Sequence, residues 1–321
     1  MMNKNNWKKK LLIVSIISFI IVIFIRLITP QESVVEKTTF INTNRDNEKT
    51  TFSQIYFVGQ SIKTPKKISS LGVQFSSTTV DDIKDNLIQK YQLKRHPSLN
   101  TLWTGESYSL SYNNINDEYT FSKKSYIKPN LVTDVNKAIK SAETFISEVF
   151  PNIETKTLSK NIRYLHGEIE MHLGERNEAN AVEIPFTYSI NSIPVFIDHK
   201  PAPLFSVIVN AEYEVQKIVF QSDLLAVFPT DNSLSTISIE KAIENINNEQ
   251  AVIINSYSDD GALYSIKDIK SGDLEKVSFE YRVDTKEAIG YPFYRFSGEL
   301  VNNEGKTIQA EIITPAVKIS E

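Results

Sequence analysis

The first hydrophobic pattern in the chain is a continuous apolar run near its N-terminus. Residues 11–25 carry no charge and contain only two serines. From Leu11 to Ile28 the segment has eighteen residues, about the shortest length that crosses a hydrocarbon core of roughly 30 Å. Arg26 lies near its end, where a long side chain reaches the headgroups. A soluble helix would show polar residues at every third or fourth position. The pattern therefore predicts a transmembrane helix rather than a buried core helix.

The charges around this run predict its orientation. Lys4 and residues 8–10 are basic and precede the run, whereas only Arg26 closes it, so the positive-inside bias places the N-terminus in the cytoplasm. A cleaved signal peptide ends in a small-x-small site, and residues 24–30 contain none. We expect an uncleaved anchor within residues 1–30, in a single-pass protein of the cell membrane whose later domains are extracytoplasmic. Residues 31–51 are polar and predict a solvated tether.

Beyond the tether, apolar stripes at helical spacing predict helices over residues 79–91, 135–149 and 239–246. The candidate N-caps are Thr79, Thr133 and Ser238. Asp81 and Asp82 are expected near the positive end of the first helix. Paired carboxylates also occur in glycosidases, but helix-start charges explain this pair better.

Period-two alternation predicts the strands of the later domains. Tyr108, Leu110 and Tyr112 alternate with serines, which is typical of a sheet that is packed on one face and wet on the other. From Val277 to Asp284, apolar residues alternate in the same way with polar ones. Further predicted strands lie at 51–58, 71–75, 118–121, 161–173, 182–190, 195–197, 204–211 and 214–220, and a hairpin turn is predicted at 302–305.

The two later groups of elements resemble a diverged duplication. Three pairs of segments correspond in order: 135–139 with 239–243, 186–188 with 279–281, and 194–196 with 292–294. The predicted fold class is α+β: an N-terminal transmembrane helix followed by tandem domains of antiparallel sheet with a packed helix. The expected boundaries are 52–130 for an N-terminal α+β domain, 131–230 for the first repeated unit and 231–321 for the second.

Composition narrows the chemistry. The chain has no cysteine, which excludes disulfides, thiolate metal sites and cysteine nucleophiles. Residues 1–26 hold five of the 35 basic residues and none of the 39 acidic ones, so the remainder carries 30 against 39, or −9. This balance argues against a nucleic-acid partner. The metalloprotease, hydrolase-elbow, Walker and dinucleotide motifs are absent from the sequence. We expect a protein that is not an enzyme and has no catalytic residues and no cofactor.

The sharpest polar constellation is His166, Glu168, Glu170 and His172. On one strand these side chains share a face, but neighbours two apart are about 6.6–6.8 Å from each other, too far for a tight zinc site. A solvent-facing polar row is favoured, and no metal is expected. His96 and His199 are interpreted as solvated loop residues. The acidic segment 258–261 is interpreted as a turn, because it lacks the ligand spacing of a calcium loop.

Aromatic residues beside a proline form a candidate partner-binding group. Tyr291, Pro292, Phe293 and Tyr294 are adjacent, and proline in a strand marks an edge or a bulge where a partner strand can add. The competing interpretation is that these aromatic residues belong to the core.

Three features together resemble a known family: the lysine-flanked anchor at 8–28, the helix segment 240–243, and the closing patterns 279–281, 291–298 and 312–317. They resemble YycH/YycI-type extracytoplasmic regulators of bacterial two-component systems and the related PepSY-like modules. The resemblance covers the anchor and residues 131–317. It implies a single-pass regulatory or scaffold protein that modulates a membrane partner such as a sensor histidine kinase. The alternative is an extracytoplasmic peptide- or glycan-binding module, including PepSY-like protease inhibition.

Overall fold

The computed structural model of the chain describes residues 54–75, 77–168, 170–198, 204–221, 225–257 and 264–318. The predicted anchor and tether lie outside the described residues, as do His199 and the acidic segment 258–261. Within the described ranges, no helix is long and apolar enough to cross a membrane.

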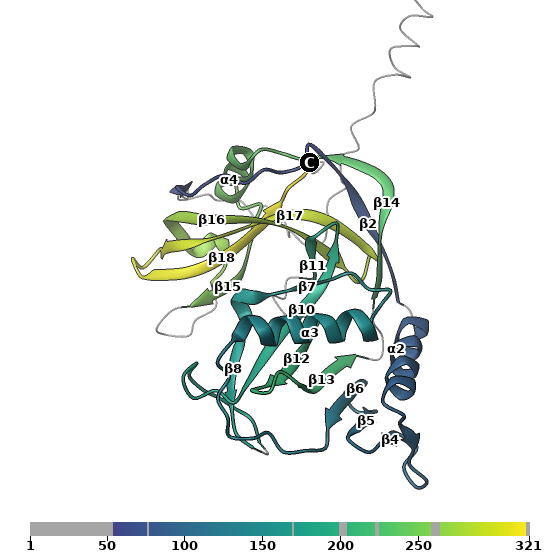
Figure 1. The fold of residues 1–321 in the computed structure, drawn as a ribbon. Helices are drawn as coiled ribbons and strands as arrows, with labels where there is room; N and C mark the ends of the chain where they lie inside the picture. The colour runs from purple at the N-terminus through teal and green to yellow at the C-terminus, as the bar shows by residue number, and fades with distance from the viewer. Residues whose placement is uncertain are drawn as a thin grey trace, which may run out of the picture.

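The fold is mixed α+β and is dominated by a large, mainly antiparallel sheet with a few helices (Figure 1). This coarse class agrees with the sequence prediction. The α-helices of the described ranges are α2 (Ser77–Lys90), α3 (Val135–Val149) and α4 (Ile239–Asn247). Short 3-10 turns occur at Ser159–Asn161 and Ile266–Asp268.

One group of antiparallel strands, here called the first sheet, extends across the N-terminal half of the described chain. In order across the sheet its strands are β3 (Lys94–Arg95), β4 (Leu102–Thr104), β5 (Tyr108–Asn113), β6 (Glu118–Lys123), β13 (Val215–Gln221), β12 (Phe205–Asn210) and β10 (Ala181–Ile190). The other edge of β10 pairs with β7 (Thr155–Thr157) and β8 (Arg163–His166), and β8 pairs with β9 (His172–Leu173).

Helix α3 covers the first sheet with the predicted apolar stripe. It contacts β10, β12 and β13 and buries Ala138, Ala142, Phe145, Ile146 and Val149. Its N-cap is Asp134, whose carboxylate accepts from the backbone N–H groups of residues 136 and 137 at 3.0 and 3.2 Å. The predicted Thr133 cap is therefore wrong, and the Thr133 hydroxyl lies 3.1 Å from the Tyr213 hydroxyl instead.

Helix α2 begins earlier than its apolar stripe predicts. It starts at Ser77, so Thr79 lies inside the helix and is not its cap. Its first turn contains no acidic residue, so the prediction that Asp81 and Asp82 mark the helix start is also wrong. Asp81 instead pairs with Lys84 at 2.6 Å on the helix surface.

The C-terminal half forms what we call the second sheet. Its antiparallel strands, in order, are β15 (Val252–Tyr257), β18 (Thr307–Pro315), β17 (Ile289–Asn302) and β16 (Ile269–Asp284), and β1 (Gln54–Phe57) pairs with β16 in parallel. Helix α4 contacts β1 and β18. The Ser238 cap is confirmed, because its hydroxyl accepts from the Lys241 N–H at 3.2 Å.

Two hairpins, one in each sheet, close with the same turn. Between β12 and β13, the Asn210 N–H donates to the Glu214 carbonyl at 3.0 Å, and the Glu214 N–H donates to Asn210 Oδ1 at 2.8 Å. Between β17 and β18, Asn302 and Lys306 make the same two bonds at 3.0 and 2.8 Å. The predicted turn at 302–305 is therefore confirmed.

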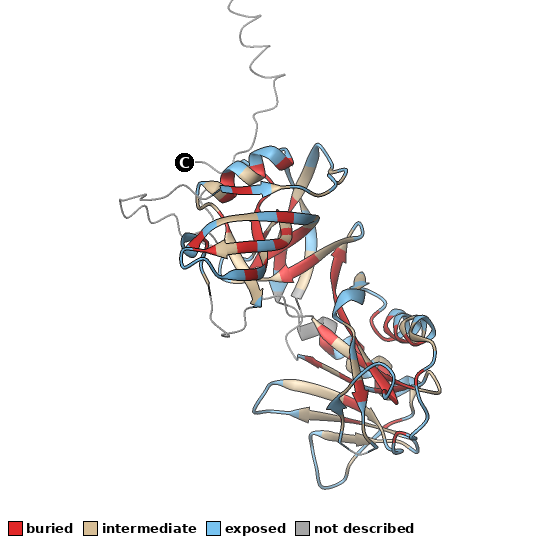
Figure 2. Ribbon diagram, turned by 90° about the vertical axis from the view of Figure 1, so that its left-hand side faces the viewer, coloured by how far each residue is buried: buried red, intermediate tan, exposed pale blue. Residues whose placement is uncertain are grey.

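The two sheets meet through strands that cross between them. Strand β11 (Ile193–Ile197) pairs with the end of β10 and then runs parallel to β16, while β2 (Lys67–Phe75) pairs with both β14 (Leu225–Ser235) and the start of β17. A small core fills the junction and consists of Leu71, Val73, Tyr188, Val195, Tyr281 and Val283. Figure 2 shows the buried residues concentrated in the interior of both sheets. In the described part of the chain, this junction core lies between two larger cores, one in each sheet.

Candidate functional site

The polar face of β16 forms the most distinctive cluster in the described chain. The alternation of Val277–Asp284 predicted a strand with one polar side, but Glu280, Arg282 and Asp284 are 1%, 0% and 5% exposed. This polar side is therefore covered rather than exposed to solvent. Part of the cover is Phe196 of the crossing strand β11, which pairs with β16 in register with Arg282 and whose ring lies against the Arg282 guanidinium.

We call Phe196, Glu280, Arg282, Arg295 and Glu311 the seam. Arg282 Nε and Nη2 lie 2.7 and 2.5 Å from Glu280 Oε1. Arg295 contacts Glu280 Oε2 at 3.5 Å and Glu311 Oε2 at 2.5 Å. Both guanidinium carbons lie over the Phe196 ring, at 4.7 and 5.4 Å from its centre. Four charges of alternating sign are therefore linked beneath one aromatic ring.

Electrostatics in the seam combine desolvation with charge pairing. Burial lowers the pKa of Arg282, and the neighbouring Glu280 carboxylate opposes that shift. For Arg295, burial is also the largest influence, but the Glu280 and Glu311 carboxylates together outweigh it and raise the pKa. Arginine remains protonated in proteins. The two guanidinium groups therefore stay charged and are unsuited to proton transfer, and their contact with Phe196 links them to β11, the strand that crosses between the sheets.

The seam is connected to an exposed edge of the second sheet. Asn255 Nδ2 donates to Glu311 Oε2 at 3.3 Å and to the Tyr257 hydroxyl at 2.9 Å. Tyr257 on β15 is 68% exposed. The exposed Tyr257 on β15 is thereby linked through Asn255 to Glu311 and the ion pairs of the seam.

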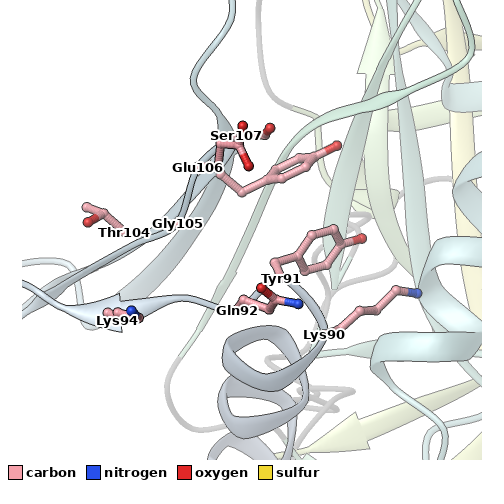
Figure 3. A pocket seen from close by; sticks show the side chains of 9 residues that line it. Lys90, Tyr91, Gln92, Lys94, Thr104, Gly105, Glu106 and Ser107 are labelled. Atoms are coloured by element: carbon pink, nitrogen blue, oxygen red, sulfur yellow. The ribbon is translucent and has the colours of Figure 1, made fainter.

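The second candidate site is a hollow of about 500 Å³ between the end of α2 and the β4–β5 turn. In Figure 3, Lys90, Tyr91 and Gln92 face Glu106 and Ser107 across it. Its remaining lining residues are Lys94, Thr104, Gly105 and Tyr108. A Cβ at Gly105 would lie 2.8 Å from the Tyr91 carbonyl oxygen, so the close approach of the turn to the helix requires glycine.

Stacked rings form the apolar wall of this hollow. The Tyr91 ring lies 4.7 Å from that of Tyr108, and the Tyr108 ring stacks on Phe121 at 5.0 Å. Burial, followed by the nearby Tyr108 and Glu148, raises the pKa of Tyr91 to about 12. Tyr91 is therefore neutral at physiological pH, and the hollow offers an aromatic surface with a polar rim.

The predicted partner-binding residues are mostly interior. Phe293 and Tyr294 are 1% and 0% exposed, Pro292 is buried and only Tyr291 is partly exposed. Their strand, β17, pairs with β16 on one side and β18 on the other, so the expected strand edge at Pro292 is wrong. The Tyr294 hydroxyl donates to the Ile237 carbonyl at 2.7 Å. Partner binding by this group stays a prediction that no observation tests.

The histidine row also has a different geometry from the predicted single strand. Gly167 turns the chain with φ of 131°, and His166 and His172 face each other across the β8–β9 hairpin. Their ring centres are 5.8 Å apart. Glu168 and Glu170 lie in the connecting turn and are exposed. His96 lies in a loop, where its Nδ1 accepts from the Ser98 N–H at 3.2 Å.

No group of three or more histidine, aspartate or glutamate side chains in the described part of the chain is arranged to hold a metal ion.

Comparisons with known proteins identify one structural similarity. No family model matches the chain, and no curated protein matches it. The crystal structure of YycH from Bacillus subtilis is similar at a TM-score of 0.36 and 12% identity, covering 78% of this chain. The match spans about half of that structure, 53% of its chain. At this TM-score the two folds are not shown to be the same.

The seam and the hollow were missed at the sequence level. The signal for the seam was present in the opposite charges of Glu280 and Arg282 on one strand face. The hollow carried no sequence signal, because its walls come together through the pairing of β3 with β4 and the approach of the β4–β5 turn to the end of α2.

Proposed function

We propose that the protein is a membrane-anchored extracytoplasmic regulatory or scaffold protein that modulates a membrane partner such as a sensor histidine kinase. The single observation that carries this proposal is the lysine-flanked apolar run at residues 11–28, followed by a folded α+β body. An anchor of this kind confines the body to the membrane surface and raises its effective concentration near a co-resident partner. The resemblance of the sequence patterns to YycH/YycI-type regulators supports the same assignment.

The proposal includes a duplicated body, with repeated units at 131–230 and 231–321. Each unit begins with a capped helix, α3 or α4, that packs on its own sheet. Each also contains a hairpin closed by the same turn, around Asn210 in one unit and Asn302 in the other. The correspondence of these turns, 92 positions apart, supports the duplication independently of the sequence matches.

The chemistry of the seam favours a binding or scaffold role for this body. Its ionisable side chains pair with one another on neighbouring strands of the second sheet, and the Phe196 ring of the crossing strand β11 lies against both guanidinium groups. Buried ion pairs contribute little net stability but disfavour alternative arrangements, a property that suits a body presenting a fixed surface.

The hollow beside α2 favours a second candidate function, an extracytoplasmic peptide- or glycan-binding module that includes PepSY-like protease inhibition. Aromatic faces with a nearby polar rim are typical of ligand sites that hold a ring or an apolar side chain. Tyr91, Tyr108 and the Glu106–Ser107 turn provide that combination.

Photo-crosslinking of the full-length protein in its native membrane distinguishes the two functions. A photoreactive residue is placed at Tyr257, at Glu106 or at the exposed control position Ile115, and the captured molecules are identified by mass spectrometry. A version whose residues 1–30 are replaced by an unrelated anchor serves as the control. We expect reproducible capture of a membrane protein from Tyr257. Capture of only wall polymer or secreted peptide, from Glu106 and with either anchor, would contradict the regulator and support the binding module.

A further inference from the structure

The β8–β9 hairpin brings His166 and His172 face to face. The two residues are directly opposite each other in the β8–β9 pair, a relation that places Cβ atoms about 4.5–5.5 Å apart. The single-strand geometry that argued against a metal does not apply, because the turn at Gly167 separates the two strands. We propose that His166 and His172 bind a divalent transition-metal ion of the zinc class.

The observed ring separation is close to that of a bound pair. Two imidazoles on one tetrahedral zinc ion, with Zn–N bonds of about 2.0–2.1 Å, have ring centres about 5.2 Å apart. The two rings here are 5.8 Å apart. Both side chains are exposed, so small rotations about their side-chain bonds close the difference.

The backbone that carries the pair is held in place. The buried Asn180 amide donates to the Gly167 and Lys128 carbonyls at 2.9 and 3.2 Å. The Ile127 N–H donates to the Glu168 carbonyl at 3.2 Å. These bonds fix the turn from outside the hairpin, so the two histidines are presented on a supported element, as a binding site requires.

Gly174 makes room for one of the two rings. A Cβ at this position would lie 2.5 Å from His166 Cδ2. Because Gly174 has no positive φ, alanine there is compatible with the backbone but displaces the His166 ring. The glycine therefore positions the ring without being a ligand.

The local charge and the ligand type favour a divalent cation. Residues 166–178 contain four glutamates and one arginine, a balance that attracts cations. Imidazole suits Zn²⁺, Cu²⁺ and Ni²⁺. With two protein ligands, solvent completes the coordination shell, and the ion is exchangeable rather than structural.

The test is a titration of the full-length protein in detergent with Zn²⁺ against a chromophoric competitor. We expect one ion per chain, and His166→Ala or His172→Ala to weaken binding at least about tenfold, since loss of even an outer-shell partner costs about 10–100-fold. Gly174→Ala should weaken binding severalfold with both ligands retained. His96→Ala, the matched control, should leave binding unchanged. Melting curves identify any variant that fails to fold.

A second measurement needs no substitution. Zn²⁺ should protect His166 and His172 of the wild-type protein from diethyl pyrocarbonate, while His96 stays reactive. The proposal is overturned if the wild type binds no Zn²⁺, if both histidine variants bind as tightly as the wild type, or if Zn²⁺ leaves the reactivity of His166 and His172 unchanged.

Discussion

The hairpins around Asn210 and Asn302 have turns of the same type, but the strands next to them pair differently. In the second sheet, β17 runs beside β16 as one continuous strand from Ile289 to Asn302. In the first sheet, the same edge of β10 is divided between β11 and β12. This division lets β11 leave its own sheet and pair with β16. A local difference between the two sheets thus creates the connection between them.

The same comparison extends to ion pairs. Arg163 and Glu183 in the first sheet pair at 2.6 Å, and the Arg163 side chain is 57% exposed. Arg282 and Glu280 pair at 2.5 Å, and the Arg282 side chain is fully buried. The chemical groups are of the same kind, so the difference between the effects of removing each arginine measures what burial adds.

Arg282→Met should have the largest effect, because it leaves the Glu280 carboxylate buried without its closest partner. Breaking a buried pair on one side costs about 3–5 kcal/mol. Arg163→Met, the exposed control, should cost no more than about 1 kcal/mol. Denaturant unfolding of the full-length protein in detergent gives both values. Equal losses for the two variants would show that the seam does not stabilise the junction.

The two asparagine turns should give matched, smaller effects. Asn210→Ala and Asn302→Ala each remove a buried acceptor from a backbone N–H, which costs about 1–3 kcal/mol. If the turns are equivalent, the two losses in unfolding free energy should agree within about 0.5 kcal/mol. The Asn210 amide also donates to the carboxylates of Glu212 and Glu214. A larger loss of unfolding free energy for Asn210→Ala would therefore measure the contribution of these two hydrogen bonds. No loss for either variant would contradict a structural role for the repeated turn.

Phe196→Leu tests the aromatic cover of the seam. Leucine keeps most of the apolar volume but loses the ring face beneath the two guanidinium groups. The lost cation–π contact and imperfect packing together should cost about 1–2 kcal/mol. Phe196→Leu in the Arg282→Met background should cost less than in the wild type, because one cation is already absent. Equal costs in both backgrounds would show that the ring and Arg282 are not coupled.

The smallest effect concerns the turn that leads into β11. Glu154 accepts from the Ser189 hydroxyl at 2.7 Å and from the Ser192 N–H at 2.9 Å, and these bonds lower its pKa. A folded pKa below the unfolded value of about 4.3 gives stability that is present above that pH and lost as the pH falls through the folded pKa.

Below about pH 4.3, wild-type stability should therefore fall slightly more steeply than that of Glu154→Gln. Glu178→Gln, at an exposed position, is the control and should follow the wild type. Denaturant unfolding between acidic and neutral pH measures the three slopes, and identical slopes for wild type and Glu154→Gln would contradict a stabilising role for the Glu154 carboxylate.

The sequence correctly predicted elements that depend on residues close together in the chain. The apolar stripe of Val135–Val149 and the Ser238 cap are periodic or short-range signals, and the structure confirms both. The Thr133 cap was wrong because Asp134, one residue later, competes for the same backbone donors with a charged acceptor. Which of two adjacent residues caps a helix depends on atomic positions, and the sequence pattern does not specify them.

The seam and the histidine pair depend on contacts between distant or folded-back segments. Alternation along β16 separates its two faces but does not reveal which one another strand covers. Strand β11 meets β16 across more than 80 residues of sequence, between Val195 and Tyr281. The sequence predicted one strand through His166 and His172. The turn at Gly167 instead divides this segment into β8 and β9, so the two histidines face each other across a hairpin.

We expect the seam to join the two sheets into one cooperative body. Hydrogen exchange of the full-length protein across a denaturant series, followed by mass spectrometry, tests it most directly through peptides from β10 and β17. Both strands should lose protection at the same denaturant concentration in the wild type, and at separate concentrations in Arg282→Met. Separate transitions in the wild type would contradict it.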